Sequence, residues 1–259
     1  MDDEERMTIF GHLEELRARL IKVMIALVIT TVVGLLFTSK LLSFIVVPAG
    51  DVKPVFLRPT EGFVTYMRVA LLTAVGLAMP VVAYQAAQFI MPGLKPHERR
   101  YVYTFLPGSV ILFLVGVAFA YFLLLPVSLK YLANFGSDIA TTNWAMCEHI
   151  AFVTNLLFWV GAIFETPLLV LFLAKVGLVT HKMLSSNRKC AVLASAILAA
   201  VVTPTPDPFN MLLVMAPLVV LYEIGVWVAR WVSWVPVHPL CAASPRGSPP
   251  RFLLVSHSE

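Results

Sequence analysis

The sequence predicts an all-α polytopic membrane protein with six transmembrane helices, and three observations support this prediction. The 259 residues are 59% hydrophobic and 13% charged, whereas soluble domains hold about 25% charged residues. The apolar residues come in runs long enough to cross a hydrocarbon core as helices. The strict two-residue alternation of a transmembrane barrel is absent. The net charge of +4 comes from loop residues rather than from a nucleic-acid-type patch, so no nucleic-acid partner is expected.

The first predicted element is an amphipathic helix at residues 8–20. Its apolar side chains recur every three or four residues and form one stripe, which consists of Ile9, Leu13, Leu16 and Leu20. Glu15 and Arg19 lie four residues apart, which favours an ion pair on the helix surface. We expect this helix to lie at the lipid headgroups. It leads directly into the first span, at about residues 21–47, which Pro48 ends.

The second span is predicted at about residues 66–90, after a polar outer loop, with a kink at Pro80. A short hinge follows at residues 89–100. Pro92 and Gly93 are expected to stop the incoming helix, because proline lacks an amide donor and glycine tolerates the turn.

The second half of the hinge carries one carboxylate among basic residues. Pro96 disfavours helix at Lys95, so the next helix should begin nearby. Glu98 should then lie in its first turn, where the helix dipole favours a carboxylate. The positive-inside rule places the hinge in the cytoplasm because of its basic residues, Lys95, Arg99 and Arg100. Such a loop could also serve only as a topology signal.

The third span is predicted at about residues 101–125, ended by Pro126, and the second outer loop at residues 128–148. The fourth span, at about residues 149–176, contains Glu165. An ionised carboxylate at mid-membrane costs a few kcal/mol or more, so intramembrane acids are functional candidates by default. The alternative is a buried glutamic acid that bridges helices. For Glu223, nearer the end of its span, we favour that structural interpretation.

The fifth span, at residues 190–202, has about thirteen residues, which at 1.5 Å each is about 20 Å and short of a 30 Å core. The proline-rich turn at residues 203–208 follows. The sixth span, at residues 209–228, is interrupted by Pro217 and is expected to be short as well.

Residues 1–230 form the predicted membrane domain, and residues 231–259 form a tail that we expect to be disordered or outside any family pattern. Basic residues gather near the N-terminus, in the hinge and in the loop between the fourth and fifth spans. Both termini are therefore expected in the cytoplasm. No cleavable signal peptide is evident, because the start is acidic, so the first apolar run should remain as an anchor.

The motifs of common enzymes are missing. The sequence contains no phosphate-binding Gly-x-x-x-x-Gly-Lys-Ser/Thr loop, no His-Glu-x-x-His and no Gly-x-Ser-x-Gly. The three cysteines, Cys147, Cys190 and Cys241, have no metal-site spacing and predict no disulfide. We expect no catalytic residues, no metal and no cofactor.

Four motifs occur in a fixed order: His12-Leu-Glu-Glu-Leu-Arg17, Phe89-x-x-Pro-Gly-Leu94 with Glu98-Arg99, Phe164-Glu-x-Pro167, and Thr203-Pro-x-Pro-Asp207. As an ordered set they resemble the TatC family, the core receptor subunit of the twin-arginine protein translocase. The resemblance runs from about residue 8 to Arg230.

The resemblance implies a receptor that recognises twin-arginine signal peptides of folded proteins and uses the proton-motive force. It implies TatB-like and TatA-like single-span partners, membrane lipid, a homo-oligomer, and the cytoplasmic membrane of a prokaryote. It assigns signal-peptide binding to Glu15 and Glu98, in a patch completed by Arg17, Phe89, Pro92, Leu94 and Arg99. Glu165 matches the family's intramembrane acid, and Pro48 and Asp207 match periplasm-side residues.

Two other functions stay open from the residues alone. One is a proton-coupled small-solute transporter that uses Glu165 as a proton relay, although no internal repeat supports it. The other is a scaffold that gathers single-span partners without transporting anything.

Overall fold

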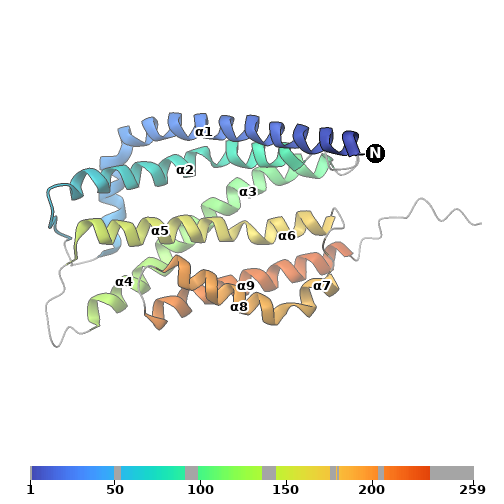
Figure 1. Cartoon of the computed structure of the whole chain (residues 1–259). Helices are drawn as coiled ribbons and strands as arrows, with labels where there is room; N and C mark the ends of the chain where they lie inside the picture. Colours follow the sequence, from blue (N-terminus) through green and yellow to red (C-terminus); the bar gives the residue numbers. More distant parts are fainter. Residues whose placement is uncertain are drawn as a thin grey trace, which may run out of the picture.

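The fold is a bundle of long helices, given by a computed structural model that describes residues 2–49, 54–90, 99–135, 144–175, 179, 181–203 and 207–233. Among these residues no strand occurs beyond one isolated β-bridge. Figure 1 shows α1 (Asp2–Val46) and α2 (Glu61–Ile90) along one side of the bundle, and α8 (Arg188–Val202) and α9 (Pro208–Ser233) along the other. The all-helical class is confirmed.

Five stretches of the described chain are long and apolar enough to cross a membrane: Leu13–Val46, Glu61–Phe89, Leu106–Asn134, Met146–Lys175 and Pro208–Arg230. They match predicted spans one to four and six. The fifth predicted span is α8, whose 15 residues reach about 22 Å at 1.5 Å per residue. Its predicted shortness is confirmed.

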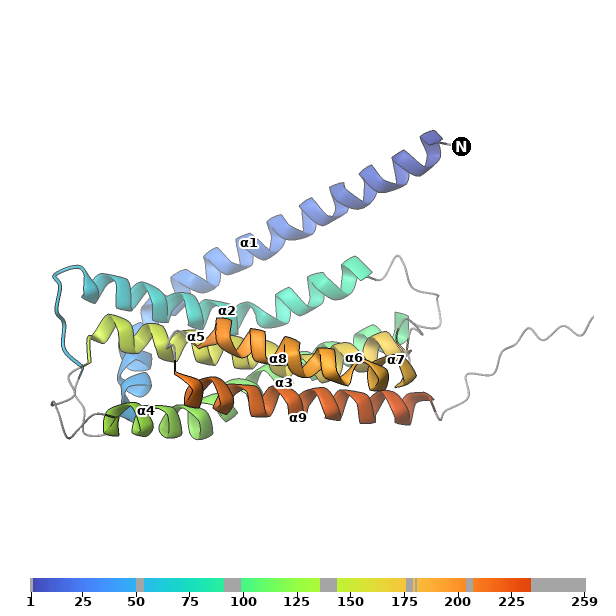
Figure 2. The same ribbon diagram turned by 60° about the horizontal axis from the view of Figure 1, so that its bottom comes forward.

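The N-terminal amphipathic segment is not a separate helix. Residues 2–46 form one continuous α-helix of 45 residues, followed by a 3₁₀ turn, η1 (Val47–Ala49), that contains Pro48. No glycine or proline lies between residues 12 and 33 to break the helix. Figure 2 shows the N-terminal half of α1 diverging from the rest of the bundle, and Leu13, Leu16 and Leu20 are exposed.

The third span does not end at Pro126. Helix α3 (Arg99–Phe119) continues through a π-helical turn, η3 (Ala120–Leu124), into α4 (Leu125–Asn134). Pro126 is the second residue of α4, which directly follows the π turn, and such local π adjustments let a membrane helix tolerate a missing amide. Part of the predicted outer loop is therefore helix, and it buries Ser128 and Leu129.

Helices α3 and α5 (Met146–Phe164) cross at two glycines. A Cβ at Gly116 would lie 2.7 Å from the Cβ of Phe164, and one at Gly161 would lie 2.8 Å from the Phe113 ring. Small residues allow such close approach of helices in membranes. This crossing is continuous with the main core, which includes Leu156 and Val160 of α5.

Helix α9 corrects the expectation of a short sixth span. It has 26 residues and passes through Pro217 without ending, because a proline inside a membrane helix is tolerated where neighbouring groups satisfy the freed carbonyl. The short helix α7 (His181–Ser186) packs against it, and the Tyr222 hydroxyl donates to the Leu184 carbonyl at 2.8 Å.

Candidate functional site

The first candidate residues lie on the charged turn of α1, residues 14–19. Glu15 Oε1 accepts hydrogen bonds from Arg19 Nε at 3.0 Å and from Arg19 Nη2. This is the predicted (i, i+4) ion pair, and its side chains keep 30% exposure for Glu15 and 18% for Arg19. Arg17 is exposed on the same turn. The structure therefore holds Glu15 against a guanidinium at a partly exposed position.

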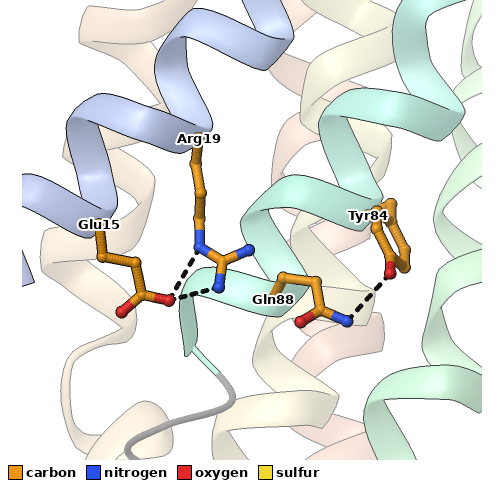
Figure 3. Close-up of polar contacts among 4 residues, drawn as sticks. All are labelled: Glu15, Arg19, Tyr84 and Gln88. Carbon is orange, nitrogen blue, oxygen red and sulfur yellow. Dashed lines mark hydrogen bonds and ion pairs between the residues drawn. The ribbon is translucent and has the colours of Figure 1, made fainter.

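The last turns of α2 carry the next candidate residue. Figure 3 shows the Glu15–Arg19 pair together with Tyr84 and Gln88 of α2. Gln88 Nε2 donates to the Tyr84 hydroxyl at 3.2 Å. Phe89, one residue further, is half-buried, and α2 ends at Ile90.

The hinge itself cannot be placed against Glu15. Pro92, Leu94 and Glu98 lie outside the described residues. Arg99 opens α3, and its side chain also falls outside the described set. The predicted meeting of Glu15 and Glu98 in one patch therefore stays a prediction.

Glu165 stands at a break in the fourth span. Helix α5 ends at Phe164, and α6 (Thr166–Lys175) begins after the Glu165 turn. The Glu165 amide donates to the Ala162 carbonyl at 3.2 Å, and this bond to the third residue before it closes a tighter turn than the regular α-helix has. Pro167 supplies no amide to the turn. The fourth span is therefore interrupted at Glu165.

The Glu165 side chain reaches α3. Ser109 Oγ donates to Glu165 Oε1 at 3.5 Å, so the carboxyl group is half-buried and faces the bundle. Sequence reasoning missed Ser109, although a serine beside Gly108 in an apolar run was a visible signal. The contact also brings together residues that are 56 positions apart, which no local pattern reveals.

Asp207 caps a helix. Its Oδ2 accepts the Asn210 amide at 2.8 Å, and its Oδ1 accepts from Asn210 Nδ2 at 3.2 Å. The arrangement is an N-cap for α9, which begins at Pro208. A second acid, Glu223, pairs with Arg188 at 3.2 Å, which joins α9 to α8, although the Glu223 side chain is 39% exposed rather than buried as expected.

The far end of the bundle is tied by backbone bonds. Val55 and Ala145 form the isolated β-bridge. The Val55 amide donates to the Trp144 carbonyl at 2.9 Å, and the Met146 amide donates to the Val55 carbonyl at 2.9 Å. The Tyr121 hydroxyl donates to the Phe44 carbonyl at 2.8 Å, close to Pro48 along the chain. This end is built from packing and backbone pairing.

No cluster of three or more His, Cys, Asp or Glu side chains that could hold a metal occurs within the described ranges. Three of the candidate carboxylates, those of Glu15, Glu165 and Asp207, instead contact different partners.

Comparison with protein families gives a match over residues 11–217 to the model described as Sec-independent protein translocase protein (TatC). The chain belongs to the TatC family. It is a component of protein transport in a membrane and not an enzyme.

Named relatives cover most of this TatC-family chain. The Sec-independent protein translocase protein TatC of Carboxydothermus hydrogenoformans is 37% identical over 89% of this chain and 96% of its own length. The chloroplastic TATC of Arabidopsis thaliana is 33% identical over 89% of this chain and 68% of its own length. A crystal structure described as the twin arginine translocase receptor TatC is 33% identical, covers 86% of this chain and 99% of its own, and superposes with a TM-score of 0.78.

Proposed function

We propose that this chain binds the paired arginines of twin-arginine signal peptides through Glu15 and Glu98. The patch would be shaped by Arg17, Phe89, Pro92, Leu94 and Arg99. The observation that carries the proposal is the Glu15–Arg19 contact, in which this carboxylate already accepts two N–H groups of one guanidinium. Planar guanidinium groups suit carboxylates in a way that the point charge of lysine does not.

Binding of a signal peptide at Glu15 requires an exchange of partners. Arg19 occupies Oε1 of Glu15, so an incoming arginine replaces an existing guanidinium contact. A pair spaced four residues apart on one helix contributes only about 0.3–0.5 kcal/mol, so a peptide that brings two arginines and an apolar segment can displace it at small cost.

The topology completes the proposal. We infer six spans, with α8 as the short fifth. Both termini would then lie in the cytoplasm, because the segments rich in Lys and Arg all fall on the same side of the membrane and such segments face the cytoplasm. Glu15 and Glu98 would then lie at the cytoplasmic surface of a prokaryotic inner membrane. Pro48 and Asp207 would lie on the periplasmic side.

Glu165 would act deeper in the membrane. Its carboxyl group and the Ser109 hydroxyl provide a polar point between α3 and the α5–α6 break. We infer that the apolar part of the signal, or the polar group of a TatB-like or TatA-like single-span partner, meets this point. Export would draw on the proton-motive force, within a complex that contains several copies of the chain.

A peptide-binding assay on the purified full chain in lipid nanodiscs tests the recognition step. Glu15→Gln should weaken twin-arginine peptide binding about tenfold or more, since hydrogen bonds to charged groups contribute about 1.5–3 kcal/mol. Glu14→Gln is the matched control, because Glu14 is an exposed neighbour without a proposed role.

Two further measurements decide between recognition and general electrostatics. A peptide with Lys-Lys in place of Arg-Arg should bind the wild-type chain much more weakly, whereas equal binding would reject guanidinium recognition. In a crosslinking assay, Glu98→Ala should lose the twin-arginine peptide, and full retention would remove Glu98 from the site.

A further inference from the structure

A groove of about 400 Å³ follows the contact between α1 and α2. Four residues of α1 and two of α2 line it: Val33, Phe37, Lys40, Leu41, Thr73 and Leu77. Apart from Lys40 and Thr73 these residues are apolar, and the Thr73 hydroxyl already donates to the Val69 carbonyl at 2.8 Å. The groove therefore offers one cation beside an apolar wall, which suits an amphiphile with an anionic head.

The depth of Lys40 matches a headgroup layer. Lys22 and Lys40 are 18 residues apart on one helix, which at 1.5 Å per residue is about 27 Å, close to the hydrocarbon thickness of about 30 Å. Phe37 and Val33 precede Lys40 by three and seven residues on the same helix face. They lie about 5 and 10 Å deeper, so the groove runs in the direction of an acyl chain.

One side of the groove is fixed by a close helix contact. A Cβ at Gly34 would lie only 2.8 Å from the Ala70 carbonyl oxygen, so glycine lets α1 touch α2 beside the groove. The N-terminal half of α1 diverges from the rest of the bundle (Figure 2). The close contact at Gly34 therefore fixes the two helices that form the walls of the groove.

We propose that this groove binds an anionic phospholipid of the outer leaflet, with its phosphate on the Lys40 ammonium and one acyl chain along Phe37, Val33 and Leu77. Within the described part of the chain, Lys40 forms no ion pair, and a phosphate supplies the missing opposite charge. The assignment to the outer leaflet rests on the proposed function, in which both termini lie in the cytoplasm. The predicted preference for an anionic phospholipid does not depend on that orientation.

Native mass spectrometry of the full chain released from nanodiscs tests the site, with equal phosphatidylglycerol and phosphatidylcholine. The wild-type chain should retain phosphatidylglycerol preferentially. Lys40→Gln should lower that preference about fivefold, which corresponds to about 1 kcal/mol per basic residue at a membrane surface. Lys40→Arg should keep the preference. Arg68→Gln removes an exposed charge of α2 that does not line the groove and should change nothing.

A second variant tests the acyl-chain track. Leu77→Trp fills the groove while leaving Lys40 in place, and should also reduce phosphatidylglycerol retention, with helicity and monodispersity checked in parallel. The proposal is overturned if Lys40→Gln retains the wild-type preference or if Arg68→Gln loses as much.

A protein occupant is the competing explanation for the groove. Disulfide-linked dimers formed by Phe37→Cys, and absent from the wild-type chain, would place a second copy there and reject the lipid. Binding of the twin-arginine peptide, measured on the same samples, separates this inference from the proposed function. If Lys40→Gln loses its preference for phosphatidylglycerol but still binds the peptide, the lipid site is supported independently of the receptor function. If the wild-type chain fails to bind the peptide but retains its lipid preference, only the proposed receptor function is rejected.

Discussion

The N-terminal half of α1 and the α3–α5 crossing are packed very differently. Only 6% of the most apolar stretch of α1 is buried, against 33% for the stretch that contains α5 and α6. At the crossing, Gly116 and Gly161 leave no room for a Cβ, whereas Leu13, Leu16 and Leu20 of α1 are exposed. The comparison indicates that the fold is stabilised at one place and that the proposed recognition occurs at another, where partners can exchange.

The largest expected effect lies at the crossing. Gly116→Ala places a methyl group 2.7 Å from Phe164 and should destabilise the fold by about 1–3 kcal/mol, because overpacking forces neighbours out of position. Thermal unfolding in detergent, followed by circular dichroism, measures this. Gly76→Ala is the control, since no heavy atom lies within 4 Å of its added Cβ, and it should raise stability slightly. Equal responses of the two variants would contradict the contrast.

A smaller effect is expected at the α9 cap. Asp207→Ala removes the acceptor of the Asn210 amide and should cost about 1 kcal/mol, the usual contribution of an N-cap. Asp207→Asn should recover most of the loss, because asparagine also caps helices well. If both variants abolish export at wild-type stability, Asp207 acts through a partner and not through the helix end.

The smallest effect is expected on the loosely packed half of α1. Arg19→Gln removes the internal guanidinium from Glu15 and should strengthen twin-arginine peptide binding about twofold. The peptide then no longer has to displace an ion pair that contributes about 0.3–0.5 kcal/mol. In a Glu15→Gln background the same substitution should have no effect, which makes a double-mutant cycle decisive. Lys22→Gln controls for the loss of one positive charge on the helix. Weaker binding by Arg19→Gln would mean that Arg19 orients Glu15 for the peptide.

Sequence alone located five of the six predicted spans as membrane-length helices, because their apolar runs are long. The break at Glu165 was predictable from Pro167, since a missing amide is a local property. The Glu15–Arg19 pair was predictable for the same reason, because a spacing of four fixes it on a helix.

The structural features that the sequence did not predict depend mainly on contacts between segments that are distant along the chain. Pro126 looks like a stop, yet the helix continues, because the π turn before it and the burial of Leu129 are tertiary features. The Ser109–Glu165 contact joins two helices. Helix α1 continues past residue 20 because no proline or glycine lies there to end it. The change from an amphipathic to a wholly apolar pattern at that point suggested two segments where there is one helix.

The unbroken course of α1 between Glu15 and Gly34 has a mechanical consequence. Glu15 lies 19 residues before Gly34, where α1 touches Ala70, so the helix forms a lever arm of about 28 Å at 1.5 Å per residue. A swing of about 10° around that fulcrum would carry Glu15 by about 5 Å, roughly one helical pitch. A small tilt of α1 would thus be enough to move Glu15, the proposed signal-binding carboxylate, toward or away from a signal peptide.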